Sequence, residues 1–202
     1  GLEAGDVILT SMGPTTYIGR PGKHLKKAKE RVYRAVAPKL QGSYTHAAIY
    51  VGDGQVVEAR GDGVRKRSLT SALENTDGAL VTRPTTDAGT RSAAAAFAKR
   101  QVGKRYESEA FLGGQGAALL LPRKMEKLLD HGGKIKDTSR FTCGNLAAAA
   151  YVSQGFTPRR DKGSWSMTVP ADFLDSKKAR RVKTLGQPMK ARPTAGRLKG
   201  VS

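Results

Sequence analysis

The residue with the clearest capacity for chemistry is Cys143, the only cysteine in this chain of 202 residues. A lone cysteine cannot form an internal disulfide, so its thiol is free to react. Cys143 precedes an alanine-rich stretch that predicts a helix ending at Gly155. A thiol at a helix N-terminus is favoured as the thiolate, and the backbone N–H groups of Cys143 and Gly144 could stabilise an oxyanion there. Gly144 would also let a substrate carbonyl come close. The alternative role for Cys143 is that of a small buried apolar residue.

A thiol nucleophile needs a base, and the chain has three histidines. His24 lies in a basic segment and His131 in a glycine-rich stretch. His46 lies in the run Thr45 to Val51, which predicts a strand, so it is the histidine that a rigid element would hold in place. The alternative is a purely structural role for His46.

Glu58 is the candidate for the group that orients the imidazole. It lies on the run Gln55 to Ala59, which predicts the second strand of a hairpin with the His46 strand. Its alternative role is that of an exposed carboxylate paired with Arg60 or another neighbour.

The length of the turn decides whether His46 and Glu58 meet. A two-residue Asp53-Gly54 turn puts Glu58 on the opposite face of the hairpin from His46. A three-residue turn over 52–54 makes the two residues diagonal neighbours, roughly 7 Å apart at the backbone. The pairs that the longer turn predicts are Val51 with Gln55, Ala48 with Glu58, and His46 with Arg60.

The remaining pattern predicts a single α+β domain with a small antiparallel sheet packed on helices. Further short strands are expected at Val7 to Leu9, Val64 to Ser68 and Ala79 to Arg83, and helices at 87–102 with Gly103 as C-cap, in parts of 111–129, and at 142–154. The domain is expected to span 1–184, with a basic insertion at about 11–44 that contains an amphipathic helix from Lys23 to Ala37. Residues 185–202 are expected to form an extended basic tail.

The charge is unusually positive: 36 Lys and Arg against 17 Asp and Glu give a formal net charge of +19. The segment from Ser176 to Ser202 contains nine cations and no acid, and the segment from Ser11 to Tyr44 has a net charge of +7. Such segments predict non-specific binding to nucleic acid or to another anionic surface. The simpler interpretation is that the charges lie on a solvated helix face. The candidate polyanion-binding residues are Lys23, Lys26, Lys27, Lys177, Lys178, Arg180 and Arg181.

Several function classes lack a sequence basis. One cysteine and three scattered histidines give no zinc-ligand spacing, and no glycine-rich loop precedes a Lys-Ser/Thr pair, so we expect no metal and no cofactor. No apolar run approaches the ~20 residues needed to span a bilayer, and no signal peptide is visible. Because the first residue is Gly1 rather than Met, a processed piece of a larger protein is one interpretation, and localisation stays open.

The ordered series of motifs resembles the circularly permuted branch of the NlpC-type, papain-like cysteine hydrolase superfamily, a branch that includes lecithin:retinol acyltransferase-like enzymes. In that branch the histidine strand precedes the cysteine helix, as here. The motifs that carry the resemblance are Gly5-Asp6-Val-Ile, His46-Ala-Ala-Ile-Tyr-Val-Gly-Asp-Gly-Gln-Val-Val-Glu58-Ala, the helix from Phe97 to Tyr106 ending in Gly-Lys-Arg-Tyr, Phe141-Thr-Cys143, and Thr168-Val-Pro-Ala-Asp172-Phe-Leu-Asp-Ser176.

The resemblance covers roughly Gly5 to Lys183 and implies a papain-like fold with Cys143 as nucleophile, His46 as base and Glu58 as orienting residue. Family members often have Ser and an acid after the cysteine, whereas this chain has Gly144-Asn145. The lipid acyltransferases usually carry His at the Glu58 position, so the glutamate favours amide over lipid chemistry.

Three hypotheses follow from these observations. The first is a cysteine hydrolase that cleaves an amide bond in peptidoglycan or a peptide. The second keeps the fold but acts on lipids, as a thiol acyltransferase or thioesterase. The third is a catalytically silent, nucleic-acid-binding component of a phage virion, where other proteins of a larger assembly would be its partners.

Overall fold

The computed structural model describes residues 1–12, 44–74, 76–107, 139–158, 168–175 and 177–186. In this part of the chain, six strands form one sheet in the order β4-β3-β2-β1-β5-β8, and all neighbouring strands are antiparallel. The strands are β1 (Val7–Met12), β2 (His46–Gly52), β3 (Gln55–Arg60), β4 (Gly63–Ser68), β5 (Thr76–Pro84) and β8 (Ala179–Leu185).

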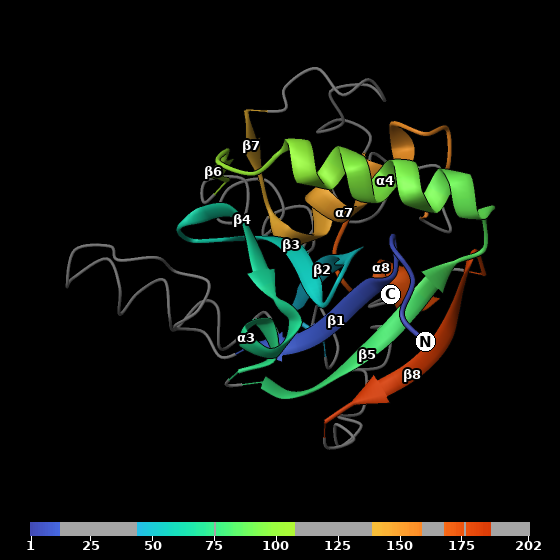
Figure 1. The fold of residues 1–202 in the computed structure, drawn as a ribbon, viewed down its shortest axis with the longest axis horizontal. Helices are drawn as coiled ribbons and strands as arrows, with labels where there is room; N and C mark the ends of the chain where they lie inside the picture. Colours follow the sequence, from blue (N-terminus) through green and yellow to red (C-terminus); the bar gives the residue numbers. More distant parts are fainter. Residues whose placement is uncertain (13–43, 75, 108–138, 159–167, 176, 187–202) are drawn as a thin grey trace, which may run out of the picture.

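Helices complete the fold and confirm the predicted α+β class. They are α3 (Leu69–Leu73), α4 (Ala88–Arg100), α7 (Cys143–Val152) and α8 (Asp172–Asp175), and a separate parallel pair is formed by β6 (Arg105–Tyr106) and β7 (Arg140–Phe141). Helices α4 and α7 contact each other and β2, as Figure 1 shows. Among the described residues, no helix combines the length and apolar character that crossing a bilayer requires.

The central strands of the sheet are buried on both faces, which explains the continuous apolar run that begins β1. Val7 and Leu9 pack in the cluster that contains the buried residues of α4 and α7. Ile8 points to the other face and packs in a second cluster with Ala72 of α3. A strand covered on both sides needs apolar residues at successive positions, not only at alternate ones. The central strands are therefore fixed from both faces.

Helix α7 packs against β2 and β3, and many of its side chains are small. Its buried residues include a run of four alanines, Ala147 to Ala150. Beyond them, the hydroxyl of Tyr151 donates a hydrogen bond to the carbonyl oxygen of Gly5. The far end of the cysteine helix is thus tied to the turn that precedes β1.

The predicted helix at 87–102 is confirmed in substance but ends earlier than expected. Asp87 is the N-cap, and the last helical residue is Arg100, followed by Gln101 as the C-cap. Gly103 is not the C-cap: its N–H donates to the carbonyl oxygen of Val64 at 2.9 Å, which joins the segment after α4 to β4.

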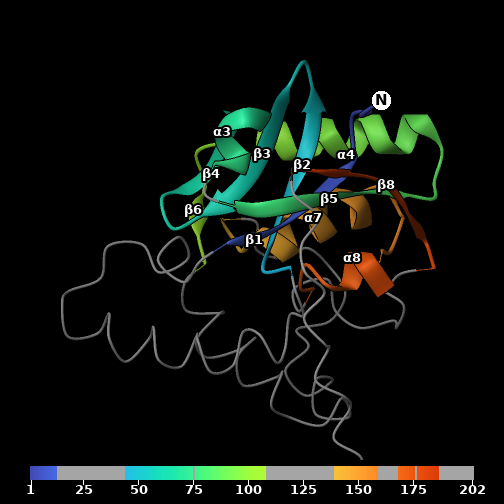
Figure 2. The same cartoon turned by 90° about the horizontal axis from the view of Figure 1, so that it is seen from below.

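The β2–β3 hairpin has the pairing of Ala48 with Glu58 that the longer turn predicted, but it does not have that three-residue turn. Ala48 pairs with Glu58, as the longer turn required. Gln55, however, pairs with Gly52 rather than Val51, and the register shifts between Tyr50 and Gly52. Asp53 and Gly54 both have positive φ, 52° and 66°, so they form a two-residue turn, and the bulge before it supplies the extra residue. Figure 2 shows this hairpin projecting at one end of the sheet.

Strand β8 was not predicted from the sequence. The cationic segment that follows residue 176 is the edge strand of the sheet, paired with β5 from Ala179 to Leu185. The predicted helices at 23–37 and 111–129, and residues 187–202 of the predicted tail, lie outside the described residues.

Candidate active site

The helix that carries the thiol has a well-defined start. Thr142 is the N-cap: its backbone is extended, with φ −86° and ψ 169°, and its hydroxyl accepts a hydrogen bond from the N–H of Asn145 at 3.3 Å. Oδ1 of Asn145 accepts in return from the N–H of Thr142 at 2.6 Å, which completes a capping box. Cys143 is therefore the first residue of α7, as predicted. Asn145 had no predicted role, although its spacing from Thr142 is that of a capping box.

Gly144 leaves no room for a side chain. A Cβ placed on it would lie 3.1 Å from Cα of Val169 and closer still to the carbonyl oxygen of Thr168, and both neighbours are backbone atoms. The packing of the 168–169 segment against the start of α7 therefore requires glycine. Its expected part in admitting a substrate carbonyl stays a prediction.

His46 and Glu58 are joined by a buried hydrogen bond between neighbouring strands. Nε2 of His46 lies 2.7 Å from Oε2 of Glu58, and the two residues are 1% and 0% exposed. The contact follows from the register, because Glu58 lies opposite Ala48 and so lies diagonal to His46 on the same face. Glu58 is thus a buried member of a hydrogen-bonded pair rather than an exposed strand carboxylate.

Cys143 reaches the first residues of β2. Its Sγ lies 4.0 Å from the carbonyl oxygen of Thr45, the residue before His46. Cys143 and His46 are also coupled electrostatically, since each shifts the pKa of the other. Because Glu58 occupies Nε2 of the imidazole, Nδ1 is the ring nitrogen left to face the thiol. The three side chains form a chain from sulfur to imidazole to carboxylate.

The interactions among these three side chains shift the pKa values of His46 and Cys143 in the directions that favour an ion pair. Burial disfavours the imidazolium, but the hydrogen bonds and charges of Cys143 and Glu58 outweigh it and raise the pKa of His46 to about 9. Burial also opposes ionisation of the thiol. The hydrogen bond and charge of His46, with the backbone N–H groups of Ala47 and Gly144, nevertheless lower the pKa of Cys143. A thiolate–imidazolium pair is therefore favoured near neutral pH.

Glu58 also faces two arginines on its other side. Its Oε1 lies 2.7 Å from Nε of Arg60 and 3.0 Å from Nε of Arg67. Burial raises the pKa of Glu58, but the hydrogen bond and charge of His46, together with Arg60, lower it overall. Arg60 was predicted only as a possible partner of an exposed Glu58, and Arg67 was not predicted at all.

The structure brings together three of the predicted site residues, Cys143, His46 and Glu58, and places others elsewhere. The predicted polyanion-binding residues fall into two groups. Lys177, Lys178, Arg180 and Arg181 are exposed on or beside β8, which β1 and β5 separate from β2. Lys23, Lys26 and Lys27 lie outside the described residues. Within the described ranges, no group of three or more His, Cys, Asp and Glu could hold a metal ion.

A thiol at the start of a helix, packed on an antiparallel sheet whose histidine strand comes earlier in the chain, defines a permuted papain-like protein. The sequence profile of the permuted papain-like amidase enzymes of the YaeF/YiiX, C92 family matches residues 2–111. This chain therefore belongs to that family of amidases. The predicted fold and superfamily are confirmed. Residues His46 and Glu58 lie in the matched region, whereas Cys143 lies after it.

A solved structure shares the fold. It is the crystal structure of metalloprotein yiiX from Escherichia coli O157:H7, which is similar with a TM-score of 0.57 and 15% sequence identity, over 92% of this chain and 98% of that chain. At this level of identity the similarity concerns the fold alone, and the word metalloprotein describes the Escherichia coli protein only. No curated protein matches the sequence.

We expect His46→Gln to slow the alkylation of Cys143 by iodoacetamide at least tenfold at pH 7. Without the imidazolium the thiol has an ordinary pKa or, because it is buried, a higher one, and a thiol with a pKa of ~8.5 is only about 3% ionised at pH 7. The measurement is the second-order rate constant from pH 5 to pH 10. Both proteins should react equally in denaturant. Equal rates for the folded proteins at pH 7 would contradict the ion pair.

We expect Gly144→Ala to destabilise the fold by about 1–3 kcal/mol, since the methyl group would meet backbone that can give way only by moving. Helix propensity alone predicts the opposite sign, because alanine is favoured over glycine within a helix by about 1 kcal/mol. Gly89→Ala in α4 is the control, since the new Cβ would meet only the exposed side chain of Asp87 at 3.0 Å. Denaturant unfolding should separate the two variants, and equal stabilities would contradict the packing argument.

Proposed function

We propose that this protein is a thiol amidase in which Cys143 is the nucleophile, His46 the general base and acid, and Glu58 the residue that orients the imidazole. The observation that carries the proposal is the buried 2.7 Å contact between Nε2 of His46 and Oε2 of Glu58, formed beside a thiol whose pKa is lowered. Membership of a family of papain-like amidases supports amide hydrolysis as the reaction class.

The first half of the proposed reaction forms an acyl-enzyme. In the resting ion pair the thiol proton of Cys143 is already on Nδ1 of His46, and the thiolate sulfur attacks the carbonyl carbon of the amide. The electron pair of the C=O bond moves to oxygen, where the backbone N–H groups of Cys143 and Gly144 are the proposed donors. When the C=O bond reforms, the C–N bond breaks. The imidazolium donates its proton to the leaving amine, and a thioester remains.

The second half releases the acid and restores the thiol. Neutral His46 takes a proton from a water molecule, whose oxygen attacks the thioester carbon. Collapse of this intermediate breaks the C–S bond. The product is released as a carboxylic acid, and Cys143 is restored as the thiolate beside the imidazolium. Glu58 holds Nε2 through both halves, so Nδ1 is the nitrogen that exchanges protons.

We propose a peptide, or the peptide part of peptidoglycan, as the substrate class. Support comes from the glutamate at position 58, where the lipid acyltransferases of the resembling branch usually have His. Acyl transfer or thioester hydrolysis on lipids is the rival reaction, and it predicts turnover of acyl lipids in vesicles.

We expect Cys143→Ala and His46→Ala each to reduce hydrolysis of peptidoglycan fragments or peptides by at least about 10³-fold, since acylation requires both groups. The measurement is the release of new amines and carboxyl groups from these fragments, with phospholipid vesicles assayed in parallel. Cys143→Ala should stay folded, with an unfolding temperature near that of the wild type, because it removes only the sulfur atom of a buried side chain. Wild-type turnover by Cys143→Ala would exclude the proposed nucleophile, and lipid turnover alone would favour the rival reaction.

We also propose that the exposed cations of β8 bind polyanions. β8 is an edge strand, and Lys177, Lys178, Arg180 and Arg181 on or beside it are exposed. Charged residues on an edge strand also protect it from pairing with another sheet, so edge protection is the competing explanation for this charge. Binding to a polyanion requires in addition that the affinity fall steeply with salt.

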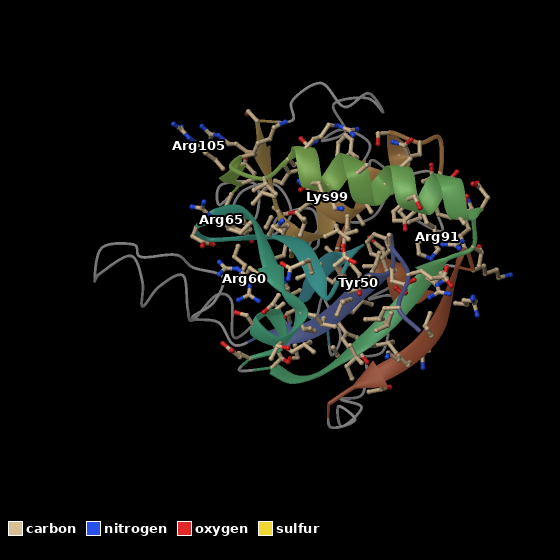
Figure 3. The ribbon with its side chains drawn as sticks, in the orientation of Figure 1. Tyr50, Arg60, Arg65, Arg91, Lys99 and Arg105 are labelled. Carbon is tan, nitrogen blue, oxygen red and sulfur yellow. The ribbon has the colours of Figure 1, made fainter. Side chains whose placement is uncertain are left out.

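We expect duplex DNA binding to weaken with salt, and replacement of these four cations by Gln to flatten the slope of log K against log salt by up to about 0.9 per lost phosphate contact. The matched control removes four exposed cations near the opposite edge, Arg65, Lys66, Lys99 and Arg105, three of which Figure 3 labels. Equal slopes for the two quadruple variants would contradict a role specific to β8. DNA binding without any hydrolysis would favour the catalytically silent virion component.

A further inference from the structure

The orienting carboxylate of Glu58 is held at both of its oxygens. Oε2 contacts Nε2 of His46, while Oε1 lies 2.7 Å from Nε of Arg60 and 3.0 Å from Nε of Arg67. Neither arginine N–H is aligned with Oε1 for a hydrogen bond, so these contacts are ion pairs. The Glu58 side chain is 1% exposed, and those of Arg60 and Arg67 are 16% and 30% exposed. The arginines therefore connect a buried charge with the surface.

The sheet register places both arginines beside Glu58. Arg60 follows two residues later on β3, so it lies on the same face. On β4, Arg65 pairs with Glu58 and Arg67 pairs with Val56, which puts Arg67 diagonal to Glu58 on that face. Figure 3 labels Arg60 and Arg65 at this end of the sheet.

Each arginine is also held at its far end. Nη2 of Arg60 donates to the carbonyl oxygen of Ala72 in α3 at 3.2 Å. Nη2 of Arg67 donates to Oδ2 of Asp62 at 2.7 Å. A guanidinium group is planar and rigid, so fixing one nitrogen limits where Nε can lie. The contacts with Ala72 and Asp62 thus position the two guanidinium groups independently of Glu58.

The site requires such an arrangement for two physical reasons. A buried carboxylate without a cation on one oxygen carries a large desolvation cost and would tend to take up a proton. A carboxyl group free on one side could also rotate away from the imidazole. In the described part of the chain, the charged or titrating groups that contact Glu58 are His46 from β2, Arg60 from β3 and Arg67 from β4. Asp62 lies behind Arg67, and Arg65 lies opposite Glu58 on β4 and forms an ion pair with Asp62 at 3.8 Å.

We propose that Arg60 and Arg67 are positioning residues of the candidate active site, which fix Oε1 of Glu58 so that Oε2 stays on Nε2 of His46, and that Asp62 holds Arg67 in place. The proposal rests on the proposed function for its catalytic consequence. The relay then extends from Cys143 through His46 and Glu58 to the surface between β3 and β4.

The test measures how the alkylation rate of Cys143 by iodoacetamide depends on pH in Arg60→Gln and Arg67→Gln. Loss of either cation raises the pKa of Glu58. As the pH falls, Glu58 then takes up a proton earlier, His46 loses its charged acceptor, and the thiolate fraction decreases. We expect the acid limb of the profile to move upward by about one pH unit, a tenfold loss of rate at acid pH, with little change near pH 8. Arg67→Lys keeps the charge and should retain most of the wild-type acid limb.

Arg65→Gln is the matched control, because Arg65 lies directly opposite Glu58 on β4 but pairs only with Asp62, at 3.8 Å, among the described contacts. It should leave the profile unchanged. Unfolding temperatures are measured for all variants. Arginine variants with lower unfolding temperatures but a wild-type acid limb would overturn the positioning role. If wild-type alkylation itself does not depend on His46, the proposed function fails. If wild-type alkylation depends on His46 but Arg60→Gln and Arg67→Gln leave the pH profile of alkylation unshifted, only this inference fails.

Discussion

The buried negative charge of Glu58 is the constraint on which the rest of the site depends. The Glu58 side chain is 1% exposed, and a carboxylate so deeply buried is stable only with opposite charge close by. His46 supplies that charge on one oxygen, at 2.7 Å, and the arginines supply it on the other. The protonated imidazole in turn stabilises the thiolate. Each group therefore keeps the next one ionised, and the strand register that sets their positions is part of the chemistry.

Much of this arrangement could be predicted from local sequence. The hairpin follows from two β-branched and apolar runs around a Gly-Asp-Gly turn. Its register stayed open between a two-residue and a three-residue turn, and of these two only the longer turn puts His46 and Glu58 on the same face. The start of α7 was predicted from the change at Cys143 to a run of alanines. Both inferences use residues that are close in sequence. The bulge between Tyr50 and Gly52 was missed, because a three-residue turn and a two-residue turn with a bulge give the same pairing of Ala48 with Glu58.

The features that the sequence did not predict depend on distant contacts. Three of the seven residues of β8 are exposed cations, and Val182 and Leu185 are its partly buried larger apolar residues, so by itself it resembles a solvated tail. It becomes a strand because β5, about a hundred residues earlier, offers an edge to pair with. The contact of Arg67 with Glu58 could not be predicted from the sequence either, because it forms only when β4 pairs with β3. Local periodicity carries no information about either contact.

The charge coupling also explains how one histidine could serve as an acid and later as a base. In the resting site His46 is protonated up to about pH 9, and part of that shift comes from Cys143. Once the sulfur is acylated, it carries no charge and no longer accepts a proton from the imidazole. Burial then opposes protonation without the contribution of Cys143, while Glu58 still favours it, so the pKa of His46 must fall. Acylation thus removes the thiolate charge that kept the imidazole protonated. After His46 has given its proton to the leaving amine, it can therefore stay neutral and accept a proton from water.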